Sequence, residues 1–191
     1  MYKLEIPKVI KKGDTIALIS ISGGRAGDED MLYRYEVGKK RLEEIWGIHV
    51  IPTPNALAGS NFLYKHPEAR AEDLMWAMQD KKINGIICMM GGDDSYRVLP
   101  YIDLNIIKNN PKVFMGYSDI TSWMAVFAKA GIRAYYGPNL LTPIAQPVAL
   151  DNYTKEAITK CLFSTEMIGD VSACSKYTNI EWRNVGEDEI N

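Results

Sequence analysis

The stretch Lys112-Val-Phe-Met-Gly-Tyr-Ser-Asp-Ile-Thr-Ser-Trp-Met124 decides the fold, because it joins a buried strand to a helix through one short turn. The apolar run at residues 113–115 is typical of a short strand that is covered on both faces. Past the turn, apolar residues recur at the i, i+3, i+4, i+7 spacing of one helix face: Ile120, Trp123, Met124 and Phe127. This pattern places the hydroxyl of Ser118 on a sharp turn between a strand and a helix.

The residues alone leave two interpretations of this turn open. A serine on a strand–turn–helix elbow, with free backbone N–H groups beside it, is typical of a catalytic nucleophile. The local motif Gly-x-Ser-x-Ile lacks the second glycine of the usual Gly-x-Ser-x-Gly elbow. Ser118 or Asp119 can equally cap the helix that follows.

The composition is that of one globular domain. The 191 residues are 47% hydrophobic and 24% charged, and the net charge of −2 gives no support for nucleic-acid binding. No apolar run approaches the roughly 20 residues that span a bilayer, so no membrane association is expected. The first residues contain no apolar segment of a signal peptide. Three scattered cysteines without a Cys-x-x-Cys pair favour reduced thiols, and we expect a cytoplasmic protein.

Strand-like and helix-like segments alternate along the chain, which is typical of a mostly parallel α/β sheet. Besides residues 113–115, strands are predicted over residues 15–20, 49–51, 84–90 and 131–136. Helices are predicted over residues 28–46, 95–101, 103–109 and 154–163, and from Pro67 onward. Residues 52–66 are expected to form a long loop of the kind that often binds ligands. Residues 171–173 and 179–182 are expected to pair as an antiparallel appendage.

A glycine-rich turn follows the strand predicted over residues 84–90. Its sequence, Gly91-Gly-Asp-Asp-Ser95, either lets backbone N–H groups face a ligand as an oxyanion or phosphate cradle, or forms an ordinary tight turn. Open α/β sheets bind ligands at the carboxyl ends of their strands. Because Gly92 and Ser118 both follow such ends on consecutive predicted strands, we expect them to lie at one site.

No cofactor or metal site is expected. The chain contains neither Gly-x-x-x-x-Gly-Lys-Ser/Thr nor Gly-x-Gly-x-x-Gly, and the glycines of residues 23–27 have the wrong spacing for a dinucleotide turn. Asp93, Asp94, Asp103 and Asp119 are candidates for a carboxylate cluster. However, Asp103 has the position of a helix N-cap, and Asp119 suits a first helical turn, where it complements the dipole.

A serine nucleophile also needs a general base and a carboxylate that orients the base. The chain has two histidines, His49 in a predicted strand and His66 in the long loop, and His66 is the better candidate. Trp182 would either stack on a planar ligand group or fill a hydrophobic edge. The residues thus offer a nucleophile and an oxyanion site without a convincing base.

Several ordered motifs resemble those of one family. Residues 113–121, Val-Phe-Met-Gly-Tyr-Ser-Asp-Ile-Thr, resemble the nucleophile elbow of the LD-carboxypeptidase and microcin C immunity family of serine peptidases. Further stretches match in the same order: Gly13-Asp-Thr-Ile-Ala-Leu18, Arg70-Ala-Glu-Asp-Leu74 with Asp80 and Ile83-Asn-Gly-Ile-Ile-Cys88, Gly91-Gly-Asp-Asp-Ser-Tyr-Arg-Val-Leu-Pro-Tyr-Ile-Asp103, and Gly137-Pro-Asn-Leu-Leu141. The resemblance runs from about Lys12 to Trp182.

This resemblance implies a flavodoxin-like sheet with helices on both faces, and Ser118 as the nucleophile. It implies an oxyanion hole made of the backbone N–H groups of Gly92 and Asp119. The other residues expected around the substrate are Gly91, Asp93, Ser95 and Trp182. The implied substrate is a small peptide amide, either an L,D-linked murein peptide or a microcin C-like peptidyl nucleotide. The Gly-Gly-x-x-Ser form of the turn is closer to the immunity branch.

Family members complete their catalytic triad with a Glu and a His from a second, C-terminal domain, and no position of this chain corresponds to either. The resemblance therefore implies a nucleophile domain over residues 1–165, the start of a linker over residues 166–191, and truncation before the second domain. We expect negligible peptidase activity from this chain alone, and self-association, for example as a homodimer. The alternative is a non-catalytic module that binds a small molecule or peptide. A flavodoxin-like nucleotide binder is disfavoured by the missing phosphate motifs.

Overall fold

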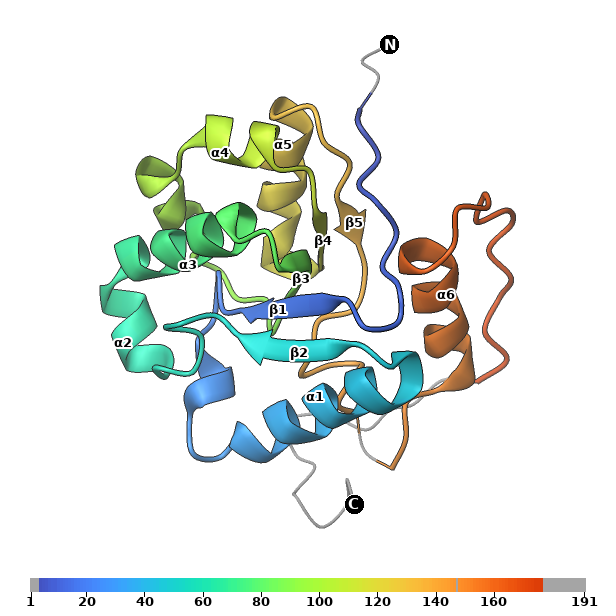
Figure 1. Ribbon diagram of the computed structural model, residues 1–191. Coiled ribbons are helices and arrows are strands. Elements are labelled where there is room, and N and C mark those ends of the chain that lie inside the picture. Colours follow the sequence, from blue (N-terminus) through green and yellow to red (C-terminus); the bar gives the residue numbers. More distant parts are fainter. Residues whose placement is uncertain (1–3, 147, 177–191) are drawn as a thin grey trace.

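The computed structural model describes residues 4–146 and 148–176, which form one parallel sheet between two layers of helices (Figure 1). The strands are β1 (Thr15–Ile19), β2 (His49–Pro52), β3 (Ile83–Cys88), β4 (Val113–Gly116) and β5 (Tyr135–Tyr136). Their order in the sheet is β2-β1-β3-β4-β5, and every neighbouring pair is parallel. This is the strand order of flavodoxin-like folds, so the predicted fold class is confirmed.

The helices connect successive strands. They are α1 (Leu32–Trp46), α2 (Ser60–Lys65), α3 (Pro67–Gln79), α4 (Leu104–Asn109), α5 (Thr121–Lys129) and α6 (Asn152–Leu162). Three short 3-10 turns accompany them, at η1 (Arg25–Gly27), η2 (Ser95–Tyr101) and η3 (Ser118–Ile120). In the described part of the chain, none of the helices is long and apolar enough to cross a membrane.

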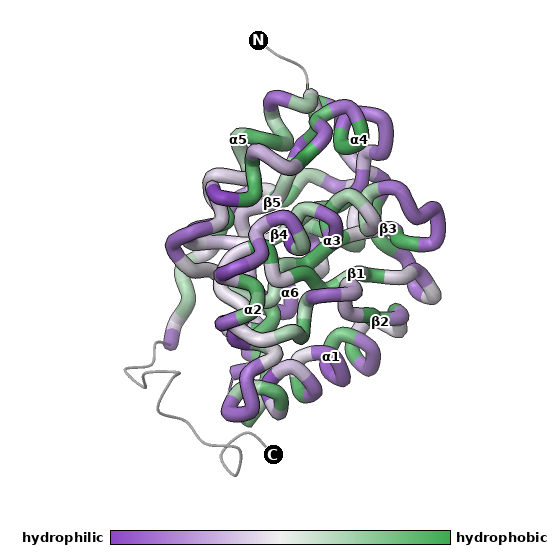
Figure 2. Tube along the Cα trace, turned by 90° about the vertical axis from the view of Figure 1, so that its left-hand side faces the viewer, coloured by the Kyte–Doolittle hydropathy of each residue, from purple (hydrophilic) through white to green (hydrophobic). Residues whose placement is uncertain are grey.

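The strands divide their side chains between two hydrophobic clusters, one on each face of the sheet. In β1, Ile16 and Leu18 join the cluster that contains Tyr35 of α1, whereas Ala17 and Ile19 join the opposite cluster. Successive side chains of a strand point to opposite faces, so a strand that is buried on both sides must be apolar throughout. Figure 2 shows this distribution, with hydrophobic residues in the central strands and many hydrophilic ones on the surrounding helices.

The position of the helices identifies the edge of the sheet at which a ligand is expected. Helices α1 and α6 cover one face, and α3, α4 and α5 cover the other. The connection after β1 leads to α1 and the connection after β3 leads to α4, on opposite faces. The neighbouring strands β1 and β3 therefore flank a topological switch point, where open α/β sheets bind ligands in a crevice at the carboxyl ends.

Strand β5 is shorter than the prediction over residues 131–136. Only Tyr135 and Tyr136 pair with β4. Upstream of them, the backbone N–H of Glu5 donates to the carbonyl of Gly131 at 2.7 Å, and Arg133 N–H donates to the carbonyl of Glu5 at 2.8 Å. The predicted strand thus pairs with the N-terminal segment instead of β4 over its first half, and this segment covers the edge of the sheet.

The long loop predicted over residues 52–66 is wrong in its second half, because that half contains helix α2. The helix follows Gly59, whose φ is 86°, and the N–H of Ser60 donates to Asp28 Oδ1 at 2.8 Å. Leu63 is fully buried. Asp28 precedes Ser60 by more than 30 residues, so the sequence around the loop gave no local signal for the helix.

The C-terminal part of the described chain contains no strand, so the strand predicted over residues 171–173 is wrong. Residues 179–182, its expected partner, lie outside the described residues. Helix α6 ends at Leu162, three residues before the expected domain boundary. The division at residue 165 stays a prediction.

Candidate active site

The turn after β4 holds Ser118 in an unusual backbone conformation. The φ of Ser118 is 65°, in the left-handed region that residues with a side chain seldom adopt. The residue is exposed and begins η3, which leads directly into α5. No side-chain hydrogen bond caps either helix, so the interpretation of Ser118 or Asp119 as a helix cap is wrong. The geometry is that of a nucleophile elbow.

Close packing and one buried amide hold the backbone before Ser118. A Cβ at Gly116 would lie 2.8 Å from Ile120 Cγ2 and 3.0 Å from Asn139 Oδ1, so a larger residue does not fit. The N–H of Tyr117 donates to Asn139 Oδ1 at 3.2 Å. Asn139 is 1% exposed and follows β5, so a segment distant in sequence fixes the elbow.

The double-glycine turn after β3 packs directly against the elbow. A Cβ at Gly91 would lie 2.9 Å from Ser118 Cβ and 3.2 Å from Ser118 Oγ. A Cβ at Gly92 would lie 2.3 Å from Ser22 Oγ and 2.8 Å from the backbone nitrogen of Gly23. The turn therefore lies between the β1 loop and the candidate nucleophile, and each contact requires glycine.

Two backbone donors face this region without a protein partner. Among the described residues, no acceptor takes the N–H of Gly92 or that of Asp119. Asp119 is the second residue of η3, where helical geometry supplies no acceptor for the N–H group. Free N–H groups next to a serine hydroxyl are the components of an oxyanion hole.

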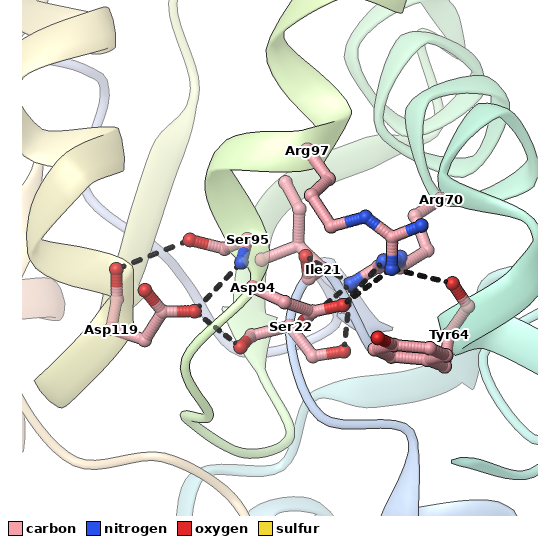
Figure 3. A network of polar contacts seen from close by, with 8 residues as sticks. All are labelled: Ile21, Ser22, Tyr64, Arg70, Asp94, Ser95, Arg97 and Asp119. Carbon is pink, nitrogen blue, oxygen red and sulfur yellow. Dashed lines mark hydrogen bonds and ion pairs between the residues drawn. The ribbon is translucent and has the colours of Figure 1, made fainter. Parts of the chain in front are cut away.

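The carboxylate of Asp119 ties the three loops together (Figure 3). Its Oδ2 accepts hydrogen bonds from Ser22 Oγ at 2.5 Å and from the N–H of Ser95 at 2.8 Å. The hydroxyl of Ser95 donates in turn to the Asp119 carbonyl at 3.2 Å. The prediction that this carboxylate only complements the helix dipole is therefore incomplete, since it also joins the β1 loop to the glycine turn.

Arg70 holds the glycine turn from the other side, also shown in Figure 3. Its two terminal nitrogens each contact one oxygen of Asp94 at 3.0 Å. Arg70 Nη1 also donates to the carbonyl of Ser22 at 3.2 Å, and the side chain is 1% exposed. Asp94 receives a second, longer contact from Arg97 at 3.4 Å. Asp94 is thus a structural anchor of the turn.

Tyr136 is a neighbour of the elbow that the sequence pattern did not single out. Its phenolic oxygen accepts the N–H of Ser118 at 3.4 Å. Its ring packs edge-to-face on that of Tyr117, with centroids 6.4 Å apart. Tyr136 is 64% exposed, so its hydroxyl lies at the open side of the elbow. Asn139 and Ser22 were missed in the same way, because only the fold brings them to Ser118.

Neither histidine contacts Ser118. His49 begins β2, so it lies at the amino end of the sheet, away from the carboxyl ends that carry the elbow. His66 Nδ1 pairs with Glu68 Oε1 at 2.7 Å, and its ring packs on Phe62. No hydrogen bond of the described residues joins an imidazole to the Ser118 hydroxyl. The general base predicted at His66 therefore lacks geometric support.

The remaining candidate residues separate into three groups. Gly91, Gly92, Ser95, Ser118 and Asp119 lie together as predicted. Asp93 lines a cavity beside the turn, and Asp103 caps α4 by accepting the N–H of Asn105 at 2.8 Å. Trp182 lies outside the described residues. Within the described residues, no group of three or more His, Cys, Asp or Glu side chains could hold a metal ion.

Comparison with known families agrees with this geometry. The family described as the LD-carboxypeptidase N-terminal domain matches residues 16–137, from the first strand to the turn after β5. The chain belongs to the LD-carboxypeptidase family. The proposed nucleophile and both glycine-rich contacts lie inside the matched residues, so the resemblance inferred from the motifs is confirmed.

Individual LD-carboxypeptidase relatives are of two kinds. The chain is 35% identical over 94 residues to the Microcin C7 self-immunity protein MccF of Escherichia coli, covering 49% of this chain and 27% of that protein. It is 30% identical over 142 residues to a probable murein peptide carboxypeptidase of Bacillus subtilis, covering 72% and 42%. The sequence therefore matches both branches of the family.

Solved structures give the same relationship. An MccF-like protein from Streptococcus pneumoniae, in complex with AMP, superimposes with a TM-score of 0.75 and 33% identity over 81% of this chain and 46% of that chain. In these three comparisons the chain spans less than half the length of the protein it matches.

Proposed function

We propose that this chain carries the nucleophile of a serine carboxypeptidase that cleaves a small peptide amide. The supporting observation is Ser118 at a φ of 65°, packed against the double-glycine turn. Ser118 Oγ would attack the scissile carbonyl, forming a C–O bond. The C–N bond to the leaving amine would then break as that amine gains a proton. Water would finally hydrolyse the acyl-serine and restore the hydroxyl.

The unpaired N–H groups of Gly92 and Asp119 would hold the carbonyl oxygen as it becomes an oxyanion. Losing one such donor costs ~3 kcal/mol of transition-state stabilisation in serine peptidases. Both donors belong to backbone that is fixed by other contacts, through Asp119 with Ser95 and through Arg70 with Asp94. A donor that is already in place needs no reorganisation during the reaction.

The base that would take the Ser118 proton is not among the described residues. Without a base, a serine hydroxyl keeps a weakly nucleophilic, protonated form. We therefore expect negligible turnover from the 191-residue chain, as the sequence motifs already indicated. A non-catalytic binding module remains the alternative, and the same elbow and cavity would then serve only to hold a ligand.

The proposed substrates come from the two kinds of relatives. One is an L,D-linked murein peptide, in line with the murein peptide carboxypeptidase. The other is a peptidyl nucleotide, in line with the AMP complex of the MccF-like protein. The three cysteines are free thiols, and this supports the reducing cytoplasm as the proposed compartment.

The test uses the protein expressed from its complete gene, with the 191-residue chain assayed beside it. An L,D-linked murein tetrapeptide and an aminoacyl sulfamoyl adenosine serve as substrate and ligand, with hydrolysis followed by mass spectrometry. Ser118→Ala should lower kcat/KM by at least about 1,000-fold and leave ligand affinity within about threefold. Ser175→Ala, an exposed serine remote from the site, is the control.

Two outcomes would count against the proposal. Turnover that persists in Ser118→Ala would exclude this serine as the nucleophile. Tight ligand binding without any turnover by the protein from the complete gene would favour the binding module. Turnover by the 191-residue chain, abolished by Ser118→Ala, would overturn the claim that this chain needs a further base.

A further inference from the structure

A cavity of about 330 Å³ lies beside the double-glycine turn, and the mechanism above does not use it. It opens between the β1 loop, α2 and the residues after β3, which is the topological switch point of the sheet. Its lining includes Ser22, Gly23, Asn61, Tyr64, Asp93 and Asp94. Its volume lies at the lower end of the roughly 300–1,000 Å³ that is typical of small-ligand sites.

The glycine turn separates this cavity from the candidate nucleophile by the width of one chain. The Cβ position of Gly91 points at Ser118, whereas that of Gly92 points at Ser22, which lines the cavity. A substrate carbonyl held by the N–H of Gly92 would therefore lie next to both. The part of the substrate on the acyl side of the scissile bond could reach the cavity across the turn.

The charges around the cavity are balanced, with one exception. Asp94 is paired with the buried Arg70 and with Arg97. Arg25, which also lines the cavity, is paired with Asp30. Asp93 is exposed, and no hydrogen bond or ion pair joins it to any described residue. The cavity thus presents one uncompensated carboxylate.

Two neutral oxygens accompany this carboxylate. The side-chain amide of Asn61 and the hydroxyl of Tyr64 line the same cavity, and neither makes a hydrogen bond within the described residues. The Tyr64 ring is held by Arg97, whose guanidinium lies 4.6 Å from the ring centroid. One carboxylate with two neutral acceptors matches the three donors of a primary ammonium group.

We propose that this cavity is a specificity subsite for an ammonium-bearing side chain on the acyl residue of the substrate, with Asp93 as its counter-charge. The proposal rests on the peptidase function proposed above, since it locates the cavity relative to the scissile carbonyl. The subsite favours a lysine-like side chain over an uncharged one of equal length. Asp94 contributes shape only, because Arg70 and Arg97 already neutralise it.

The test compares two L,D-dipeptides that differ only in the ammonium group, N-acetyl-L-lysyl-D-alanine and N-acetyl-L-norleucyl-D-alanine. Both are titrated by NMR into the protein from the complete gene, in a Ser118→Ala background that prevents turnover. The lysyl probe should bind about five- to tenfold more tightly than the norleucyl probe. Asp93→Asn should abolish this preference and leave the norleucyl affinity unchanged. Glu156→Gln, an equal loss of charge on the exposed side of α6, should preserve it.

The possible failures are distinguishable. Equal affinities of the two probes for the Ser118→Ala protein would overturn the subsite and leave the peptidase proposal intact. A preference that survives Asp93→Asn would place the ammonium group elsewhere and overturn the role of Asp93. If neither probe binds, the L,D-peptide substrate is wrong, and the subsite falls with it.

Discussion

Arg70 and Asp94 form a two-pronged ion pair beneath the double-glycine turn, with both nitrogen–oxygen distances at 3.0 Å. Arg70 belongs to α3 and Asp94 to the turn after β3, so the pair fixes the turn to the helical layer. Asp119 holds the same turn from the elbow side through Ser95. The position of the Gly92 N–H is therefore determined by contacts on both sides of the turn.

Arg70→Lys should destabilise the fold although it preserves the charge. A lysine ammonium cannot make the two parallel contacts with Asp94, and breaking a buried pair leaves a carboxylate poorly compensated. We expect the free energy of unfolding to fall by about 2–4 kcal/mol in urea denaturation. Arg97→Lys, at the partly exposed partner of the same carboxylate, should cost less than about 1 kcal/mol. Equal losses in the two variants would contradict this assignment.

Gly92→Ala should disturb the turn through a steric clash. The new Cβ would lie 2.3 Å from Ser22 Oγ and 2.8 Å from the Gly23 nitrogen, and the backbone contact cannot be relieved by a rotamer change. We expect a loss of about 1–3 kcal/mol in the free energy of unfolding. Gly137→Ala is the control, because its Cβ would meet the flexible Met115 side chain at 3.0 Å. A Gly92→Ala variant as stable as the control would show that the turn can shift freely.

Ser22 and Asp119 should be energetically coupled. The 2.5 Å hydrogen bond between them joins the β1 loop to the elbow, and its loss leaves a polar group unpaired. A double-mutant cycle of Ser22→Ala and Asp119→Ala, measured by urea denaturation, should give a coupling energy of about 1 kcal/mol. Ser22→Ala combined with the remote Glu156→Gln should be additive. Additivity in both cycles would mean that the hydrogen bond contributes nothing to stability.

Lys112 should make stability depend on pH above neutrality. Its ammonium donates to the carbonyls of Ala77 and Asp80 at 2.7 and 2.5 Å, and burial lowers the pKa of Lys112 from 10.5 to about 8. Between pH 8 and 10.5 the unfolded chain therefore binds more protons at this residue than the folded protein does. Stability contributed by Lys112 should rise with pH across that window and stay flat below it.

The measurement is the free energy of unfolding from pH 7 to 10.5 in the wild type and in Lys112→Met. The difference between the two proteins cancels the other titrating groups. It should shift by about 2 kcal/mol in favour of the wild type as the pH rises from 8 to 10.5. A constant difference over this range would show that the pKa of Lys112 is the same in the folded and unfolded chains.

The strands were predictable because each is a short apolar run with a clear stop. The run at residues 113–115 became β4, and residues 15–20 and 84–90 became β1 and β3 with ends within two residues. Helix α2 was missed because it is six residues long and depends on the contact between Ser60 and Asp28. The first half of the last predicted strand failed for a similar reason, since Glu5 competes with β4 for its backbone groups.

The sequence by itself determined the parallel α/β fold, the family and the position of Ser118, because apolar periodicity and ordered glycine motifs are local properties of the chain. Tertiary structure alone decided which polar groups surround that serine. Ser22, Arg70 and Asn139 come from three distant elements, and their roles depend on distances of about 3 Å that no spacing in the sequence encodes. It also showed that Asp93 is unpaired while its neighbour Asp94 is neutralised. Adjacent residues of the same type differ here because a tight turn points their side chains toward different partners.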